Sequence, residues 1–225
     1  MRVRVPFKNL AGPVPQGRLA EGHVGLLLVD CHRYALSPTD GYARIALEHG
    51  IFRELAEYYE QLEQVVPNLQ RLLEGCRQRR VPVFFTRLAG DVRDPASIAP
   101  QAIATGLWAR ADSPDADFMP GLEPRAGEPI LDKTTSGAFT GTTLHAVLMA
   151  HEVRHLIVAG VLANEAVART AHTAADLGYH VVVPSDACAA ETWTLHTLTM
   201  TVLVGGLIRV RTVSGVLEML DDQRT

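Results

Sequence analysis

The chain has 225 residues, of which 47% are hydrophobic and 20% are charged, and its formal net charge is −4. This composition fits one globular domain with a sizeable apolar core, and it argues against the basic footprint of a nucleic-acid-binding domain. The three cysteines show no CxxC spacing, and their odd number argues against a disulfide framework. No stretch is long and apolar enough for a signal peptide or a membrane span. We therefore expect a cytoplasmic protein that binds neither membranes nor nucleic acids.

Residues 1–23 are rich in Gly and Pro without periodicity, which predicts an irregular N-terminal arm before a single domain over 24–225. Short apolar segments then predict strands, and apolar residues at helical spacing predict helices between them. The expected strands are Val24–Asp30, Val81–Thr86, Glu128–Lys133, His155–Val161, His180–Asp186 and Leu207–Thr212. The expected helices are Ile51–Arg79, Thr143–Val153, Asn164–Leu177, Thr192–Val204 and Ser214–Leu220.

The regular alternation of strands and helices determines the expected fold class. Consecutive parallel strands joined by helices form right-handed βαβ crossovers, which place helices on both faces of the sheet. The sequence therefore predicts an α/β fold, a three-layer αβα Rossmann-like domain with a six-stranded, mainly parallel sheet. One segment interrupts the alternation. Gly90–Pro120 is long, polar and rich in Pro, and a segment of this length after a strand is typical of a functional loop.

Three of the predicted strand ends carry features that the interior of a sheet does not need. Asp30 ends the first strand, Lys133 ends the third, and a tight crossing to a helix follows Gly160 at the end of the fourth. In an open parallel sheet such ends can meet at one crevice, where ligands bind. A carboxylate and an ammonium brought together there suit proton transfer near neutral pH, although each residue alone is as well explained by a structural ion pair.

Three stretches resemble the motifs of the isochorismatase-like (cysteine hydrolase) superfamily, in the same order and at similar spacing. "LLLVDCHRYALSP" is similar to the first motif, in which an Asp ends the first strand. "LDKTTSGAFTGTTLHAVL" is similar to the second motif, which has a Lys before a short turn and a helix. "VAGVLANEAVARTAHTAADLGYHVVVPSDACAA" is similar to the third. The residues of the three motifs are most similar to those of the N-carbamoylsarcosine and ureido amidohydrolase branch.

The resemblance assigns roles to residues at these positions. It implies Asp30 as general base, Lys133 as its cationic partner and Ala166 at the position of the nucleophilic Cys of the family. It also implies that the bond between Leu162 and Ala163 is a cis peptide that shapes an oxyanion hole, and that the reaction needs no cofactor. The substrate class would be a small amide, carbamoyl or ureido compound.

The missing thiol at position 166 leaves three explanations open. In the first, Ala166 is an engineered replacement of a working Cys in an amidohydrolase, and the surrounding "NEAVARTA" supports this because it stays close to the Cys-containing enzymes. In the second, the chain is a natural hydrolase without the Cys that relies on Asp30 and Lys133, as isochorismatases do. In the third, it is a non-catalytic binding homologue. We place the first slightly ahead of the second.

Further residues are candidates for the pocket wall. Arg87 follows the second strand, where its guanidinium can bind a substrate carboxylate through two hydrogen bonds. A salt bridge from Arg87 to Asp91 or Asp94 explains the residue equally well. His32 can line the pocket or cap a turn. Glu165 can face solvent or act as a substitute base. The remaining candidates are aromatic residues that would form an apolar wall, Trp108 and Phe139.

Metal binding and assembly complete the expectations. The "TRLAGDVRDP" stretch after the second strand supplies carboxylates but no histidine, so we predict no metal site. Members of the resembled family are usually dimers or larger. The apolar face of the long helix over 51–79 exceeds what one sheet would cover, which also indicates a homo-oligomer.

Overall fold

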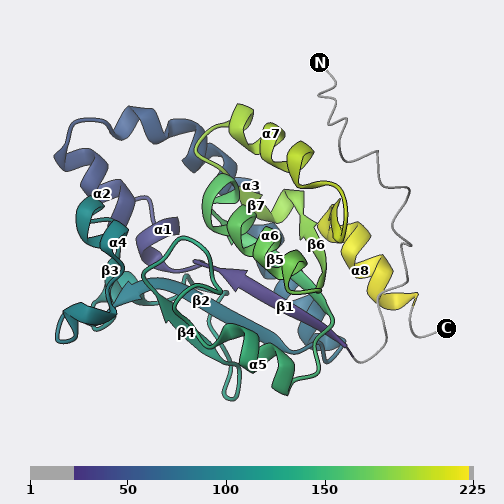
Figure 1. The fold of residues 1–225 in the computed structure, drawn as a ribbon. Coiled ribbons are helices and arrows are strands. Elements are labelled where there is room, and N and C mark those ends of the chain that lie inside the picture. The colour runs from purple at the N-terminus through teal and green to yellow at the C-terminus, as the bar shows by residue number, and fades with distance from the viewer. Residues whose placement is uncertain (1–22, 223–225) are drawn as a thin grey trace.

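The computed structural model describes residues 23–222, and the predicted N-terminal arm lies almost entirely outside this range. Eight strands form one sheet, in the order β3-β2-β1-β5-β6-β8, with β4 paired to β2 and β7 to β5 (Figure 1). All seven strand pairings are parallel. The strands are β1 (Val24–Val29), β2 (Val83–Gly90), β3 (Ala109–Arg110), β4 (Ile130–Lys133), β5 (His155–Val161), β6 (His180–Pro184), β7 (Cys188–Ala189) and β8 (Ile208–Arg211).

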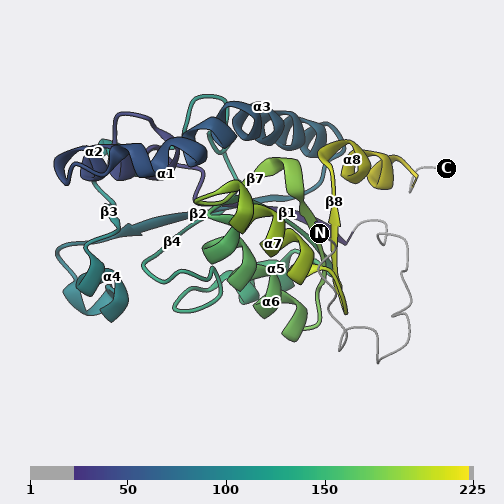
Figure 2. The same cartoon turned by 90° about the horizontal axis from the view of Figure 1, so that it is seen from above.

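Helices cover both faces of this sheet. Figure 2 shows α3 and α8 on one side and α5, α6 and α7 on the other. The helices are α1 (Arg33–Leu36), α2 (Gly41–Glu48), α3 (Ala56–Gln78), α4 (Pro100–Thr105), α5 (Leu144–Ala150), α6 (Ala168–Asp176), α7 (Trp193–Leu203) and α8 (Val213–Asp221). The structure thus confirms the predicted three-layer α/β class.

The predicted strand number was wrong by two. The six expected strands are all present, and the additional β3 and β7 are two residues long each. Strands this short carry no apolar alternation, because the period-two signal needs at least four residues. The segment over 90–120 also holds α4, which begins at Pro100, a residue that favours the first position of a helix.

Alternation along β1 builds the two halves of the core. Leu26 and Leu28 pack in the cluster that contains the buried residues of α3 and α8. Leu27 and Val29 pack in the opposite cluster, with residues of α5 and α6. Because successive side chains of a strand point to opposite faces, one continuous apolar run supplies both layers.

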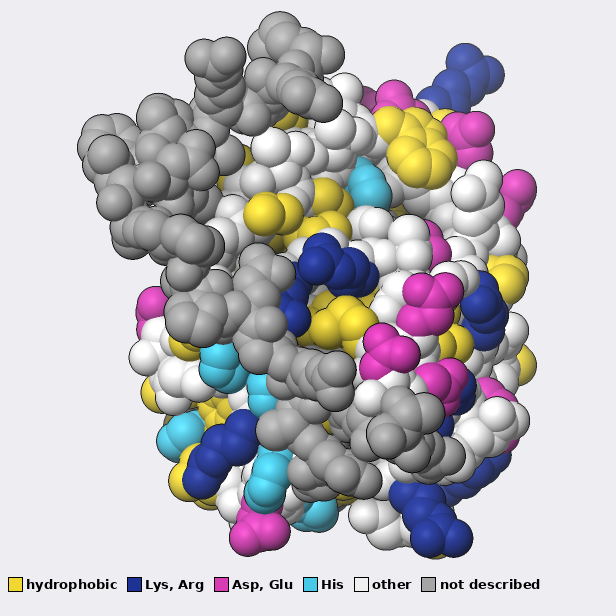
Figure 3. Space-filling model, turned by 90° about the vertical axis from the view of Figure 1, so that its right-hand side faces the viewer, with side chains coloured by type: hydrophobic (Ala, Val, Ile, Leu, Met, Phe, Trp, Pro, Cys, Tyr) yellow, Lys and Arg dark blue, Asp and Glu magenta, His cyan; other side chains and the backbone are white. Residues whose placement is uncertain are grey.

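The surface that Figure 3 presents carries acidic, basic and apolar side chains, and several histidine side chains gather in the lower left of the view. Among the helices of the described residues, none is long and apolar enough to cross a membrane.

Gly160 of β5 allows the strand to lie close to β1 where the site begins. Its φ is +127°, and a Cβ added there would lie 2.0 Å from the carbonyl oxygen of Val29, its partner in the β1 register. We expect Gly160→Ala to lower the free energy of unfolding by at least about 3 kcal/mol, since the clash adds to the strain of a positive φ.

The matched control for this variant is Gly106→Ala. Gly106 also has a positive φ, +67°, but nothing lies within 4 Å of its added Cβ. It should cost only about 1 to 2 kcal/mol, the strain of the left-handed region. Urea unfolding followed by circular dichroism measures both, and equal losses would contradict the close approach of β5 to β1.

Candidate active site

Asp30 lies directly after β1, at the centre of the sheet. Its backbone N–H donates to the carbonyl of Thr86, which extends the pairing of β1 with β2 by one residue. The residue has a φ of +56°, in the left-handed region that Asp and Asn tolerate better than most side chains. Only 4% of Asp30 is exposed. The end of the strand therefore turns a carboxylate into the crevice instead of continuing the ladder.

Lys133 brings the opposite charge to this carboxylate. It is the last residue of β4 and pairs in register with Leu88 of β2. Its Nζ donates to Oδ2 of Asp30 at 2.7 Å and to the carbonyls of Thr135 and Ser136 at 3.1 Å each. The side chain of Lys133 is 0% exposed. A buried ammonium needs all of its donors used, and these three acceptors supply that.

Ala166 lies in the elbow that connects β5 to α6. A π-helical turn over Ala163–Val167 forms this elbow, and Ala166 is 5% exposed. The cis peptide bond of this region joins Val161 to Leu162, one bond before the predicted position. Ala163 is fully buried in the core, whereas Leu162 borders the pocket.

These residues surround one pocket of about 680 Å³. That volume suits a small-molecule ligand. Asp30, Lys133 and Ala166 all line it, as do residues of α4 and its flanks, so the long segment after β2 contributes one wall. The remaining lining residues are Tyr42, Leu88, Ala99, Gln101, Ala102, Thr105, Leu107, Thr134, Thr135, Ser136, Gly137, Thr140, Leu162, Glu165, Arg169 and Glu191.

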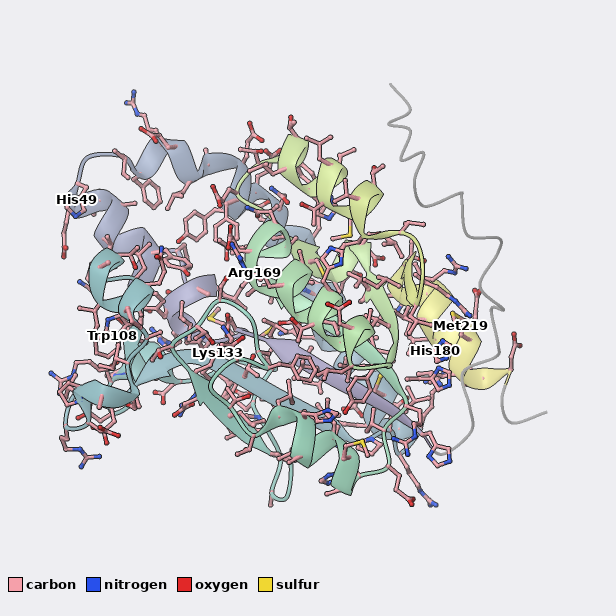
Figure 4. All side chains as sticks on the ribbon, in the orientation of Figure 1. His49, Trp108, Lys133, Arg169, His180 and Met219 are labelled. Atoms are coloured by element: carbon pink, nitrogen blue, oxygen red, sulfur yellow. The ribbon has the colours of Figure 1, made fainter. Side chains whose placement is uncertain are left out.

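A second ion pair lies on the elbow side of the pocket. Nε of Arg169 donates to Oε2 of Glu165 at 2.9 Å, and the hydroxyl of Ser136 donates to the same oxygen at 3.2 Å. Figure 4 shows Arg169 on α6 and Lys133 on β4 at the same edge of the sheet. The carboxylate of Glu165 is therefore bound by Arg169 and Ser136. It matches neither of the two expectations, a group that faces only solvent or an unpartnered base. The spacing of four residues between Glu165 and Arg169 on a helix was the sequence signal for this pair.

Two predicted pocket residues have other roles. Arg87 does not line the pocket and binds neither Asp91 nor Asp94. Its guanidinium donates to both carboxylate oxygens of Asp132, at 2.7 and 2.8 Å. This pair of N–H donors is therefore not available to bind a substrate carboxylate. His32 is fully buried and stacks on Tyr34, with ring centroids 6.0 Å apart. Burial lowers the pKa of His32, so it is a neutral core residue.

The two predicted aromatic wall residues also lie outside the pocket lining. Trp108 packs beside Gly90 of β2, where a Cβ added to the glycine would lie 3.2 Å from Cε3 of the indole, while its neighbour Leu107 faces the pocket. Phe139 packs near Tyr179, with ring centroids 6.2 Å apart. The sequence indicated an aromatic wall, but these rings are held by local packing next to the pocket.

The three thiols of the chain are all in the core. Cys31, Cys76 and Cys188 are each at most 1% exposed. Burial, as the largest cause, raises the pKa of Cys31 well above its usual range and that of Cys76 and Cys188 to about 12. None of them supplies a thiolate to the pocket near neutral pH. Within residues 23–222, no group of three His, Cys, Asp or Glu side chains is arranged to hold a metal ion.

The chain matches the model of the isochorismatase domain over residues 26–214. It is 32% identical to the N-carbamoylsarcosine amidase of an Arthrobacter species over 133 residues, which cover 56% of this chain and 49% of that protein. It is 43% identical to the streptothricin hydrolase of Streptomyces noursei over 81 residues, which cover 33% of this chain and 29% of that protein. Both matches span less than half of the relative's own length.

A solved structure shares the fold over nearly the whole chain. A cysteine hydrolase from Pseudomonas syringae pv. phaseolicola superposes with a TM-score of 0.79 at 20% identity, covering 95% of this chain and 100% of that one. The fold, the order of the motifs and the family model therefore agree, and the resemblance found in the sequence is confirmed. The chain belongs to the isochorismatase family.

Proposed function

We propose that this hydrolase cleaves the C–N bond of a small amide, carbamoyl or ureido compound in the pocket at the end of β1. The observation that carries the proposal is the buried pair of Asp30 and Lys133, joined at 2.7 Å, which lines the same pocket as Ala166. The similarity to an amidase supports the type of bond. No cofactor enters the proposed reaction.

With a thiol at position 166, the residues suit a covalent route. Asp30 accepts the proton of the thiol, and the thiolate attacks the carbonyl carbon, while backbone N–H groups at the elbow stabilise the oxyanion. Asp30 then returns the proton to the leaving nitrogen as the C–N bond breaks. A water molecule, deprotonated by Asp30, hydrolyses the thioester and the proton returns to the thiol. The ammonium of Lys133 donates to Asp30 at 2.7 Å, and its positive charge would favour the thiolate at position 166.

With alanine at position 166, a second route needs no nucleophile from the protein. For an amide, Asp30 accepts a proton from water, which attacks the carbonyl directly, and returns the proton to the leaving nitrogen as the C–N bond breaks. For a vinyl ether, the protonated carboxyl of Asp30 donates its proton to the terminal vinyl carbon. Water then adds to the resulting oxocarbenium carbon and returns a proton to Asp30, and the C–O bond breaks to release an alcohol and a carbonyl product. The observation that favours this route is that the Asp30–Lys133 pair is fully assembled although Ala166 offers only a methyl group.

Turnover on one substrate panel tests the proposal and separates the routes. The panel contains simple amides, ureido acids and vinyl ethers, and the enzymes are the chain as given and its Ala166→Cys variant, each with and without Asp30→Asn. Turnover by either enzyme that is lost with Asp30→Asn supports the proposed base. If neither form turns over any compound while ligands still bind, the chain is a binding homologue and the proposed function is wrong.

We also propose a homo-oligomer, although not through the surface that the sequence suggested. α3 buries its main apolar positions, including Leu69 and Leu72, against the sheet. Several of the exposed large apolar side chains lie close together in the chain on and after α7, where Trp193 and Leu198 are each 41% exposed and Val204 is 49% exposed. We expect light scattering to give at least twice the mass of one chain, and Leu198→Lys to shift the mass toward the monomer. A monomeric parent chain would contradict this.

A further inference from the structure

The charged side chains that line the pocket are not balanced. Two of its carboxylates are matched by cations: Asp30 pairs with Lys133 at 2.7 Å, and Glu165 pairs with Arg169 at 2.9 Å. These four groups leave the pocket neutral. The lining holds one further charged group, the carboxylate of Glu191.

Glu191 lies between β7 and α7, across the elbow from Ala166. It is exposed, and its Oε1 accepts a hydrogen bond from Nδ2 of Asn164 at 3.0 Å. This neutral amide holds the carboxylate in place and adds no charge. Within residues 23–222, Glu191 forms no salt bridge with Lys, Arg or His. The formal charges of the lining residues therefore sum to one net negative charge, that of Glu191, which no cation among residues 23–222 matches in a salt bridge.

Tyr42 of α2 lies in the wall of the pocket that Asp30 and Glu191 also line. Its side chain lines the pocket and packs edge-on against Tyr34, with ring centroids 4.9 Å apart. Burial, then the negative charge of Asp30 and, more weakly, that of Glu191 raise the pKa of Tyr42. Asp30, Tyr42 and Glu191 line the same pocket, so a single small molecule there can lie between the two carboxylates.

An anionic ligand is a poor match for this arrangement. The cation available to it is Arg169, whose Nε already donates to Glu165. A carboxylate placed beside Arg169 would compete with Glu165 and would be repelled by Glu191. An ammonium or guanidinium group would instead be attracted by the negative charge of Glu191. The carboxylate oxygens of Glu191 would also accept hydrogen bonds from its N–H groups.

We propose that the substrate carries a cationic nitrogen, an ammonium or a guanidinium, and that Glu191 binds it while the amide or ureido group lies between Asp30 and position 166. The inference rests on the proposed function for the location of the reacting group. It makes Glu191 a specificity-determining residue and Tyr42 the wall that the cation lies against.

Binding of three amides of similar length to the chain as given tests this without requiring turnover. The probes are 4-aminobutanamide, which is cationic, butanamide, which is neutral, and succinamate, which is anionic. Dissociation constants come from chemical-shift titrations at pH 7 and low salt. The aminoamide should bind at least about fivefold more tightly than butanamide, and succinamate should bind most weakly.

Glu191→Gln keeps the shape of the side chain and its hydrogen bond to Asn164 but removes the charge. It should bring the aminoamide to within about twofold of butanamide, and added salt should do the same in the parent chain. Glu63→Gln is the matched control, since Glu63 is exposed on α3 outside the pocket lining. This variant makes the same change in net charge and should leave the preference intact.

The outcomes separate this inference from the proposed function. Tightest binding of succinamate, no binding of any probe, or a preference for the aminoamide that survives Glu191→Gln would each overturn it. A preference that Glu191→Gln removes supports it. If that preference is found while neither the parent chain nor the Ala166→Cys variant turns over any compound of the substrate panel, the cation site stands and the proposed function fails.

Discussion

Ala166→Cys is expected to raise the turnover of an amide or ureido substrate by at least about a thousandfold, because loss of a nucleophile usually costs several orders of magnitude. Position 166 lines the pocket together with Asp30 and Lys133, so a thiol there would lie beside both its base and a cation that favours the thiolate. The measurement is kcat/KM for one substrate in both forms. A gain below tenfold would contradict the covalent route and leave the direct attack of water.

The control for this variant places a thiol nearby but outside the pocket. Ala168→Cys does so, two residues along the chain at the start of α6, and it should give no gain. Alkylation with iodoacetamide near pH 7 provides a second readout, since the three native thiols are buried and have raised pKa values. Only the thiol introduced at position 166 should react rapidly. Equal labelling of the parent chain would mean that a native thiol is accessible.

Asp30→Asn is expected to abolish turnover in both the parent chain and the Ala166→Cys variant. Asn accepts the left-handed backbone at this position and fills the same space, so the change removes the proposed base with little change in shape. It also leaves the buried ammonium of Lys133 without its counter-ion. Breaking a buried ion pair on one side typically costs about 3 to 5 kcal/mol, so the free energy of unfolding should fall by that amount.

A double variant separates the chemical role of this pair from its structural role. Lys133→Met alone leaves the carboxylate of Asp30 buried without its cation, and it should destabilise the chain to a similar extent. Asp30→Asn combined with Lys133→Met removes both charges, so its loss of stability should be smaller than the sum of the two single losses. Urea unfolding gives the three values. Activity should stay absent in all three, and activity in the double variant would exclude Asp30 as the base.

The sequence by itself determined the three-layer fold class and the strand ends at which the proposed site residues lie. A continuous apolar run such as Val24–Val29 is typical of a strand covered on both faces, and a charged residue that follows such a run lies where the strand ends, at the carboxyl end of the parallel sheet. Asp30 and Lys133 were found in this way. The three motifs added the position of the elbow and thus of Ala166.

The wall of the pocket was decided by the tertiary structure. Arg87 pairs with Asp132 because β2 and β4 place these two residues side by side in register, 45 positions apart in the chain. A sequence window contains no information about that register, and the nearer Asp91 and Asp94 were the natural expectation. Trp108 and Phe139 were misplaced for the same reason, since neighbours from other elements hold each ring.

Glu191 and Tyr42 illustrate the same limit for binding. Each lies in a segment with no periodic pattern that points to a site, and 149 positions of chain separate them. Which charges remain unpaired in a pocket depends on the distances among side chains from five or more elements. The local pattern of apolar and polar residues sets which faces are buried, but only the packed chain sets which charges meet, because charge pairing acts across space and not along the sequence.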